Sequence, residues 1–129
     1  MAQQKEIKEF SIKERTRSFG HALRGLRIFF RTAHNAWIHA SILLVTILLG
    51  LYLHLSHFEW LFLVLAAGLV LSAEAFNSAI EIDIDLTSPD YHPYARDTKD
   101  VAAAAVLITA CTAFIIGLCI FIPHIQPLL

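Results

Sequence analysis

The stretch WLFLVLAAGLVLSAEAFNSAI (residues 60–80) decides the fold, because its 21 residues are almost all apolar. A membrane-spanning helix needs about 20 mostly apolar residues. Two further runs, residues 36–55 and residues 101–122, have the same character. The three runs predict an all-α membrane protein with transmembrane helices over these ranges. A soluble helical bundle is the alternative, but such continuous apolar runs leave no solvated face.

The composition of the whole chain agrees with this prediction. Hydrophobic residues make up 57% of the chain, whereas soluble domains have roughly 45–50%. We expect residues 1–129 to form a single membrane domain. Within it, residues 1–33 should form an N-terminal tail and an amphipathic surface helix, because apolar residues recur at helical spacing among arginines over residues 11–33.

The positive charges indicate how the chain crosses the membrane. Eight of the ten Lys and Arg residues precede residue 36, and the other two, Arg96 and Lys99, lie between the second and third spans. The positive-inside rule therefore places the N-terminus in the cytoplasm and the C-terminus outside. Arginines of the N-terminal helix can attach it to anionic lipid, and Arg17 among them is also a candidate phosphate contact.

A ladder of polar residues begins inside the second span. Glu74, Asn77, Glu81 and Asp85 follow one another at spacings of three, four and four residues, which places all four on one face of a helix. Asp83 falls on the opposite side of that helix. A carboxylate buried in a membrane is costly and indicates a functional site.

These residue types suit phosphoryl transfer. Neighbouring carboxylates repel unless cations or protons intervene, and Mg²⁺ binds carboxylate and phosphate oxygens. Arg96 and Lys99 can meet phosphate oxygens, and a buried carboxylate can act as a general base. The sequence has no GxxxxGK[ST] motif. Two other interpretations stay open from these residues alone: a ladder that only holds helices together, and a proton or ion pathway.

A polar loop over residues 87–98, with Pro89 and Pro93 as helix stops, should connect the second and third spans. Lys99 and Asp100 then open the third span. An acidic residue at the start of a helix is favourable, so Asp100 has a structural explanation beside any chemical one.

A long motif covers the end of the second span, the loop after it and the start of the third span. The stretch EAFNSAIEIDIDL (residues 74–86) and the stretch SPDYHPYARDTKDVAAAAVL (residues 88–107) resemble the small membrane kinases of bacteria, the prokaryotic diacylglycerol kinase family, which includes undecaprenol kinase. The family pattern E-x-x-N-[ST]-A-I-E-x-x-x-D, Y-H and A-K-D-x-[AG]-A-A-V-L is nearly complete here. The match extends upstream over FGHALRGLRIFFRTAHNAWIH (residues 19–39).

The resemblance implies a homotrimer in the bacterial cytoplasmic (inner) membrane, with active sites shared between neighbouring protomers at the cytoplasmic face. It implies MgATP as co-substrate, a lipid alcohol from the bilayer as acceptor, and direct transfer without a phosphoenzyme. Undecaprenol and diacylglycerol both stay open as the acceptor. The expected partners are thus ATP, the lipid, the membrane and further copies of the chain, with no nucleic acid.

The resemblance also implies roles for individual residues. Glu74 would be the base near the lipid hydroxyl, Asn77 would orient the reacting groups, and Glu81 would hold Mg²⁺ and the nucleotide. The other nucleotide-binding residues would be Asp85, His92, Lys99, Asp100 and Arg17, with Lys99 on phosphate.

One departure from the family pattern concerns the metal. The family commonly has the segment E-x-N-x-R-I-H, whose Glu also ligates the metal. Here the segment reads AHNAWIH (residues 33–39), so Ala33 takes the Glu position and Trp37 the Arg position. Water, phosphate, His34 or Asn35 could fill the gap. This departure leaves open a catalytically weak or inactive relative. A small transporter and a purely structural membrane protein are the alternatives from other classes.

Overall fold

The computed structural model describes residues 11–128, apart from the side chains of residues 34 and 128. Within this range the chain forms four α-helices and a final 3₁₀ turn. They are listed in chain order: α1 (Ile12–Thr32), α2 (His34–Tyr52), α3 (His57–Thr87), α4 (Pro93–Ile125) and η1 (Gln126–Leu128). The tail expected over residues 1–10 lies outside the described residues.

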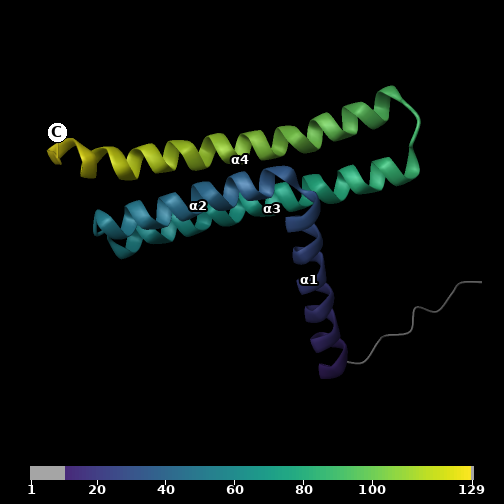
Figure 1. Cartoon of the computed structure of the whole chain (residues 1–129), viewed down its shortest axis with the longest axis horizontal. Helices are drawn as coiled ribbons and strands as arrows, with labels where there is room; N and C mark the ends of the chain where they lie inside the picture. The colour runs from purple at the N-terminus through teal and green to yellow at the C-terminus, as the bar shows by residue number, and fades with distance from the viewer. Residues whose placement is uncertain (1–10, 129) are drawn as a thin grey trace, which may run out of the picture.

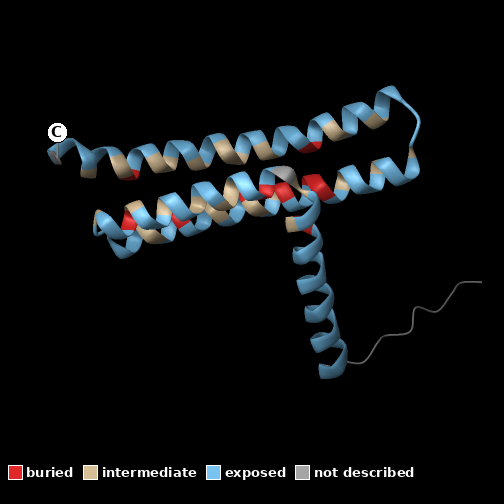
Figure 2. Cartoon of the chain, viewed as in Figure 1, coloured by how far each residue is buried: buried red, intermediate tan, exposed pale blue. Residues whose placement is uncertain are grey.

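Helices α2, α3 and α4 lie alongside one another, and α1 projects away from them (Figure 1). Three helices are long and apolar enough to cross a membrane: Asn35–Tyr52 in α2, and the whole of α3 and α4. The prediction of an all-α protein with three such helices is confirmed. Most of their surface is exposed in the single chain (Figure 2), as expected for helices that face lipid or neighbouring protomers.

A sharp corner separates α1 from α2. Ala33 has an extended backbone (φ −81°, ψ 105°), which interrupts the helix for one residue. The indole Nε1 of Trp37 donates a hydrogen bond across the corner to the carbonyl oxygen of Phe30 at 3.0 Å. Ala36 is completely buried just after the corner, so there is no room for a larger side chain there.

The turn between α2 and α3 is built by local hydrogen bonds. His54 has a positive φ of 54°, which ends α2 before residue 55, the end predicted for the first span. Ser56 and Glu59 then form a capping box at the start of α3: the Ser56 hydroxyl accepts from the Glu59 N–H, and the Ser56 N–H donates to the Glu59 carboxylate at 2.7 Å. This arrangement satisfies two of the free N–H groups at the helix start.

Helices α2 and α3 approach closely beside this turn. A Cβ atom placed on Gly50 would lie 2.8 Å from the ring of Trp60, so only glycine allows this contact. Leu55, Leu63 and Ile120 form a small buried cluster at the same end, against which Trp60 packs. The cluster joins α3 and α4 to the turn.

The connection from α3 to α4 corrects one sequence-based prediction. Helix α4 begins at Pro93, not at Lys99, and the His92 ring nitrogen Nδ1 accepts a hydrogen bond from the Tyr94 N–H at 3.3 Å as its cap. Pro93 therefore starts the helix, because proline needs no N–H partner in a first turn and its φ already suits a helix. Asp100 lies two turns inside α4, so a favourable position at the helix start does not explain it.

Contacts between polar side chains join α3 to α4 near both ends. Lys99 of α4 pairs with Asp85 of α3 near the connecting loop. At the other end, Nε2 of His124 lies 3.6 Å from Oε1 of Glu59. Helices α3 and α4 are therefore antiparallel neighbours over nearly their whole length.

Candidate active site

The polar ladder of α3 runs from a buried to an exposed environment. Glu74 is only 2% exposed, and Asn77 is 7% exposed. Glu81 and Asp85, further along the same face, are exposed. Asp83 is exposed as well. The ladder thus connects the apolar middle of the molecule to its polar end.

Two oxygen atoms of the ladder are buried without a hydrogen-bond partner among the described residues: Oε2 of Glu74 and Oδ1 of Asn77. Leaving one buried polar group unsatisfied costs about 1–3 kcal/mol. Evolution tolerates such a cost where the group acts on a ligand. These two atoms are therefore the candidate ligand-contacting groups of α3.

Asn77 links the buried and exposed parts of the ladder. Its amide Nδ2 donates to Oε1 of Glu81 at 3.0 Å. This hydrogen bond uses the amide nitrogen of Asn77 and leaves Oδ1 available as an acceptor. The hydrogen bond also holds the Glu81 carboxylate on the face of α3 that carries Glu74.

Lys99 lies beside the exposed end of the ladder. Its ammonium pairs with Oδ1 of Asp85 across the two helices, and the Lys99 side chain is 35% exposed whereas that of Asp85 is 68% exposed. The structure therefore brings together three predicted site residues of α3 and α4: Glu81, Asp85 and Lys99 lie at one end of the same antiparallel pair.

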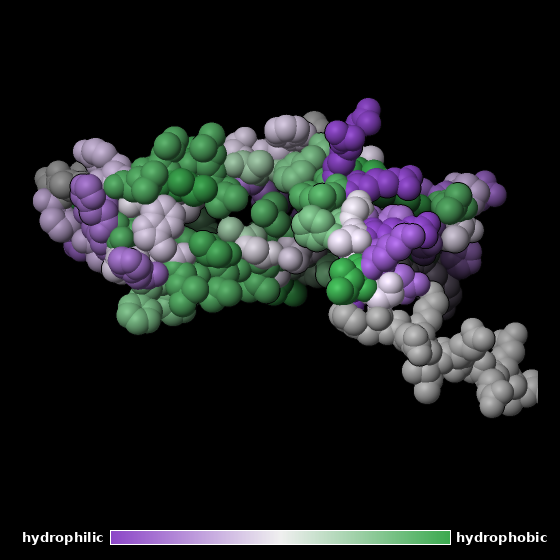
Figure 3. All heavy atoms as spheres, turned by 90° about the horizontal axis from the view of Figure 1, so that it is seen from below, coloured by the Kyte–Doolittle hydropathy of each residue, from purple (hydrophilic) through white to green (hydrophobic). Residues whose placement is uncertain are grey.

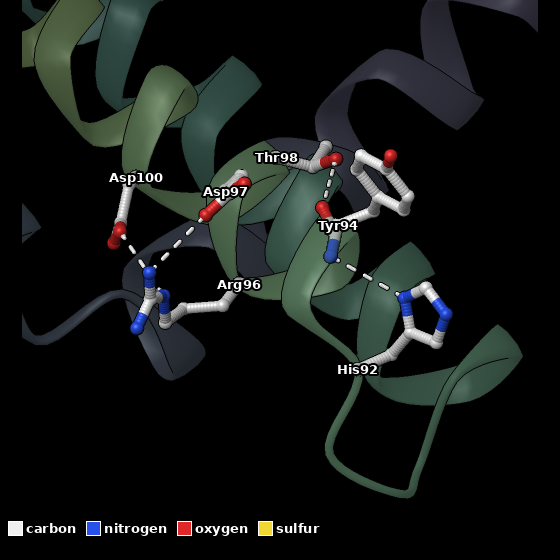
Figure 4. Close-up of polar contacts among 6 residues, drawn as sticks. All are labelled: His92, Tyr94, Arg96, Asp97, Thr98 and Asp100. Atoms are coloured by element: carbon white, nitrogen blue, oxygen red, sulfur yellow. Dashed lines mark hydrogen bonds and ion pairs between the residues drawn. The ribbon is translucent and has the colours of Figure 1, made fainter.

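The first turns of α4 carry a second polar group (Figure 4). Arg96 lies between two carboxylates, with Nη2 3.4 Å from Asp97 and Nε 3.9 Å from Asp100. His92, as the helix cap, presents its second ring nitrogen outward. Asp100 thus has a cationic neighbour on its own helix, and His92 has a structural role beside any contact with a nucleotide.

Two predicted residues lie apart from this group. Arg17 is exposed on α1 and forms no ion pair with another described residue. Ala33 lies at the corner between α1 and α2. Neither residue forms a hydrogen bond or an ion pair with a described residue of the ladder.

Among the described residues, a metal would be held by few protein ligands. Within residues 11–128 no group of three or more His, Cys, Asp or Glu side chains is placed to hold a metal ion. Mg²⁺, however, often binds through one or two carboxylates together with substrate phosphates and water. Glu81 lies beside the unpaired oxygen of Asn77. It therefore suits Mg²⁺ binding in which phosphates and water supply the remaining ligands.

Ser78 is a further buried polar residue beside the ladder that the sequence-based prediction did not single out. It is 8% exposed on α3, and it follows Glu74 by four residues, which places the two on the same helix face. The spacing that identified the ladder could also have identified this hydroxyl.

Hydrophilic residues gather at the two ends of the molecule, with a hydrophobic band between them (Figure 3). This distribution and the three long apolar helices define the class: an α-helical, multi-pass membrane protein with a polar site at one end of its spans.

The chain belongs to the prokaryotic diacylglycerol kinase family, because the model of that family matches residues 20–121. It is therefore an enzyme of the lipid kinase class. Three similar relatives agree with this assignment. The chain is 39% identical to an undecaprenol kinase of Bacillus subtilis over 109 residues, and the match covers 84% of this chain and 89% of the relative.

The other two relatives are diacylglycerol kinases. The chain is 36% identical to that of Synechocystis over 113 residues, covering 87% of this chain and 65% of the relative. It is 31% identical to that of Helicobacter pylori over 109 residues, covering 79% of this chain and 85% of the relative.

Proposed function

We propose that the chain transfers the γ-phosphoryl group of ATP directly to the hydroxyl of a membrane lipid alcohol, at the cytoplasmic face of the bacterial inner membrane. The observation that carries this proposal is the buried Glu74 carboxylate, whose Oε2 has no partner among the described residues. Family membership supports the reaction class. Glu81, Asp85 and Lys99 supply polar groups further along the same helices.

The length of α3 suits a reaction between a lipid and a soluble nucleotide. Helix α3 has 31 residues and is therefore about 46 Å long at about 1.5 Å per residue, whereas the hydrocarbon core of a bilayer measures about 30 Å. If residues 60–80 fill that core, Glu74 lies about 9 Å inside it. Glu81 and Asp85 then stand at the surface, where ATP can reach them.

In the proposed reaction, the lipid hydroxyl gives its proton to the Glu74 carboxylate while its oxygen attacks the γ-phosphorus of ATP. The bond between that phosphorus and the bridging oxygen of ADP breaks, so ADP leaves with the electron pair. Asn77 orients the reacting groups through its free Oδ1. Transfer of this kind depends mainly on positioning and on neutralising phosphate charge.

Mg²⁺ would be held by Glu81 together with the phosphates, where it would neutralise phosphate charge. Lys99 would exchange its ion pair with Asp85 for contact with a phosphate oxygen. Asp85, Asp100 and His92 would contact the rest of the nucleotide, and Arg17 would reach it from α1.

The assembly around each site is also part of the proposal. We place α1 on the membrane surface, because Phe19, Leu23 and Leu26 are exposed on it among arginines. The excess of Lys and Arg before α2 favours a cytoplasmic N-terminus and an outer C-terminus. Three copies of the chain would form the active enzyme, as the resemblance to the family implies.

Two acceptors are compatible with this function, undecaprenol and diacylglycerol. The relative named undecaprenol kinase is matched at 39% identity over 89% of its length, and this similarity favours undecaprenol. Neither the transporter nor the purely structural alternative is favoured by the family assignment.

The test is transfer of labelled phosphate from ATP by the purified protein in mixed micelles, with undecaprenol and diacylglycerol offered in parallel. Glu74→Gln should lose activity by about 1,000-fold, since the amide cannot accept the proton. Asp83→Asn removes a carboxylate from the opposite side of α3 and should stay active. Absence of product from both lipids, in protein that is folded and oligomeric, would overturn the proposed function.

A further inference from the structure

Trp37 connects α2 to α1 across the corner at which Ala33 interrupts the helix. Its indole Nε1 donates a hydrogen bond to the carbonyl oxygen of Phe30 at 3.0 Å. Phe30 lies in the last turn of α1, where carbonyl oxygens lack partners within the helix. The rings of Trp37 and Phe30 also meet edge to face, with their centres 6.0 Å apart. The Trp37 side chain therefore caps the end of α1 and holds the corner in its observed shape.

The corner is packed against the spanning helices, whereas the rest of α1 is not. Phe29 is 6% exposed, and its ring centre lies 5.1 Å from that of Phe30. Ala36 is completely buried on the α2 side of the corner. Helix α1 contacts both α2 and α3 (Figure 1), but its residues 12–28 are all exposed (Figure 2). Helix α1 is therefore held at its C-terminal end, where the Trp37 hydrogen bond lies.

The corner lies level with the buried end of the polar ladder. Gly50 of α2 approaches Trp60 of α3, which sets the register of the two antiparallel helices. Ala36 is 14 residues before Gly50, and Glu74 is 14 residues after Trp60. Because both helices rise equally per residue, Ala36 and Glu74 stand at the same level. Ala36 is 0% exposed and Glu74 is 2% exposed, so both residues belong to the same buried layer of the molecule.

We propose that Trp37 is a positioning residue that keeps the corner closed over Glu74 and so keeps water away from this carboxylate. The inference rests on the proposed function, in which Glu74 is the base, and it deepens that function by naming what keeps the base dry. Exclusion of water prevents a side reaction. A water oxygen could attack the γ-phosphorus of ATP and give its proton to Glu74, while ADP leaves with the electron pair of the broken bond. The products would be ADP and inorganic phosphate.

The other explanation for Trp37 is that it only anchors the chain at the membrane surface, as interfacial tryptophans do. Its side chain is well placed for that role, because Trp37 is 64% exposed. An interfacial anchor directs its N–H toward water and headgroups, but the N–H of Trp37 is bonded to Phe30. Trp37→Phe separates the two roles, since it keeps an apolar aromatic ring and loses the donor. Trp60→Phe is the matched control, because it removes the second indole of the chain.

The first readout needs no catalysis. Ser78 is 8% exposed and follows Glu74 by one helical turn, so Ser78→Cys, with both native cysteines changed to alanine, reports water at the ladder. A water-soluble maleimide should label it about tenfold more slowly than it labels Asp83→Cys, on the exposed opposite side of α3. Trp37→Phe should speed the labelling of Ser78→Cys about fivefold, the factor expected for one hydrogen bond. Trp60→Phe should leave it unchanged.

The second readout is phosphate release from MgATP without a lipid acceptor. Trp37→Phe should raise this rate about fivefold and leave the KM for ATP unchanged. Unchanged hydrolysis would overturn the proposal, as would equal effects of Trp37→Phe and Trp60→Phe on labelling. Equal labelling of Ser78→Cys and Asp83→Cys would also overturn it, and that comparison needs no change of Trp37. If Trp37→Phe speeds labelling but no lipid is ever phosphorylated, the corner covers the ladder and the proposed function fails.

Discussion

Asn77 donates a hydrogen bond to Glu81, with Nδ2 and Oε1 3.0 Å apart, and so ties a buried residue of α3 to an exposed one. The bond spans one helical turn, from the apolar interior to the polar end. It orients the Glu81 carboxylate while leaving its second oxygen open. The position of this carboxylate is thus set by a neighbour that is itself part of the ladder.

Glu81→Gln tests the proposed metal site. The amide oxygen of glutamine can still accept from Asn77, so the geometry survives while the negative charge is lost. We expect kcat/KM to fall about 100-fold and the Mg²⁺ requirement to rise. The measurement is initial rate against Mg²⁺ concentration at saturating lipid. Asp83→Asn loses the same charge on another face of α3, and a similar loss in that variant would contradict the assignment.

Lys99→Gln tests the proposed phosphate contact. Loss of the ammonium should raise the KM for ATP about tenfold, because a charge-assisted contact with phosphate disappears. Arg96→Gln is the control, since Arg96 pairs with Asp97 and Asp100 on its own helix. An equal change of the ATP KM in both variants would mean that general positive charge near the loop, and not Lys99, matters.

Ala33→Glu tests the missing carboxylate. If the corner between α1 and α2 lies near the metal in the assembled enzyme, the added carboxylate should lower the half-saturating Mg²⁺ concentration about tenfold. Thr32→Glu adds the same charge to the exposed last residue of α1 and should leave it unchanged. A titration in which neither variant differs from the unsubstituted protein would show that this corner does not reach the metal.

Gly50→Ala tests the close packing of α2 on α3. A methyl group 2.8 Å from the Trp60 ring forces one helix to shift, so we expect a loss of about 1–3 kcal/mol of stability. In Gly68→Ala the methyl group meets open space and improves helix propensity by about 0.5–1 kcal/mol. Thermal unfolding in one detergent compares the two, and equal melting temperatures would refute the packing argument.

The sequence predicted well those features that depend on residues close together along the chain. Three apolar runs predicted three long helices, and spacings of three and four predicted the shared face of Glu74 and Asn77. Ser78 was within reach of the same reasoning. The functional assignment of these residues stays a prediction.

Features that depend on distant contacts or on competing local preferences were harder to predict. Pro93 can end one helix or start another, and the cap provided by the His92 side chain decides for the second. The approach of Gly50 to Trp60 becomes visible only when α2 and α3 are packed. The pairing of Asp85 with Lys99 depends on the short loop that turns α4 back along α3.

The polar contacts near both ends of α3 and α4, Glu59 with His124 and Asp85 with Lys99, have a consequence for the surrounding lipid. A helical hairpin held at both ends cannot shorten or lengthen to follow its membrane, and mismatch must be met by tilting or by deforming the bilayer. The depth of Glu74 relative to the headgroups then varies with acyl-chain length. We therefore expect the reaction rate to depend on bilayer thickness, which a cell can change through its fatty acids.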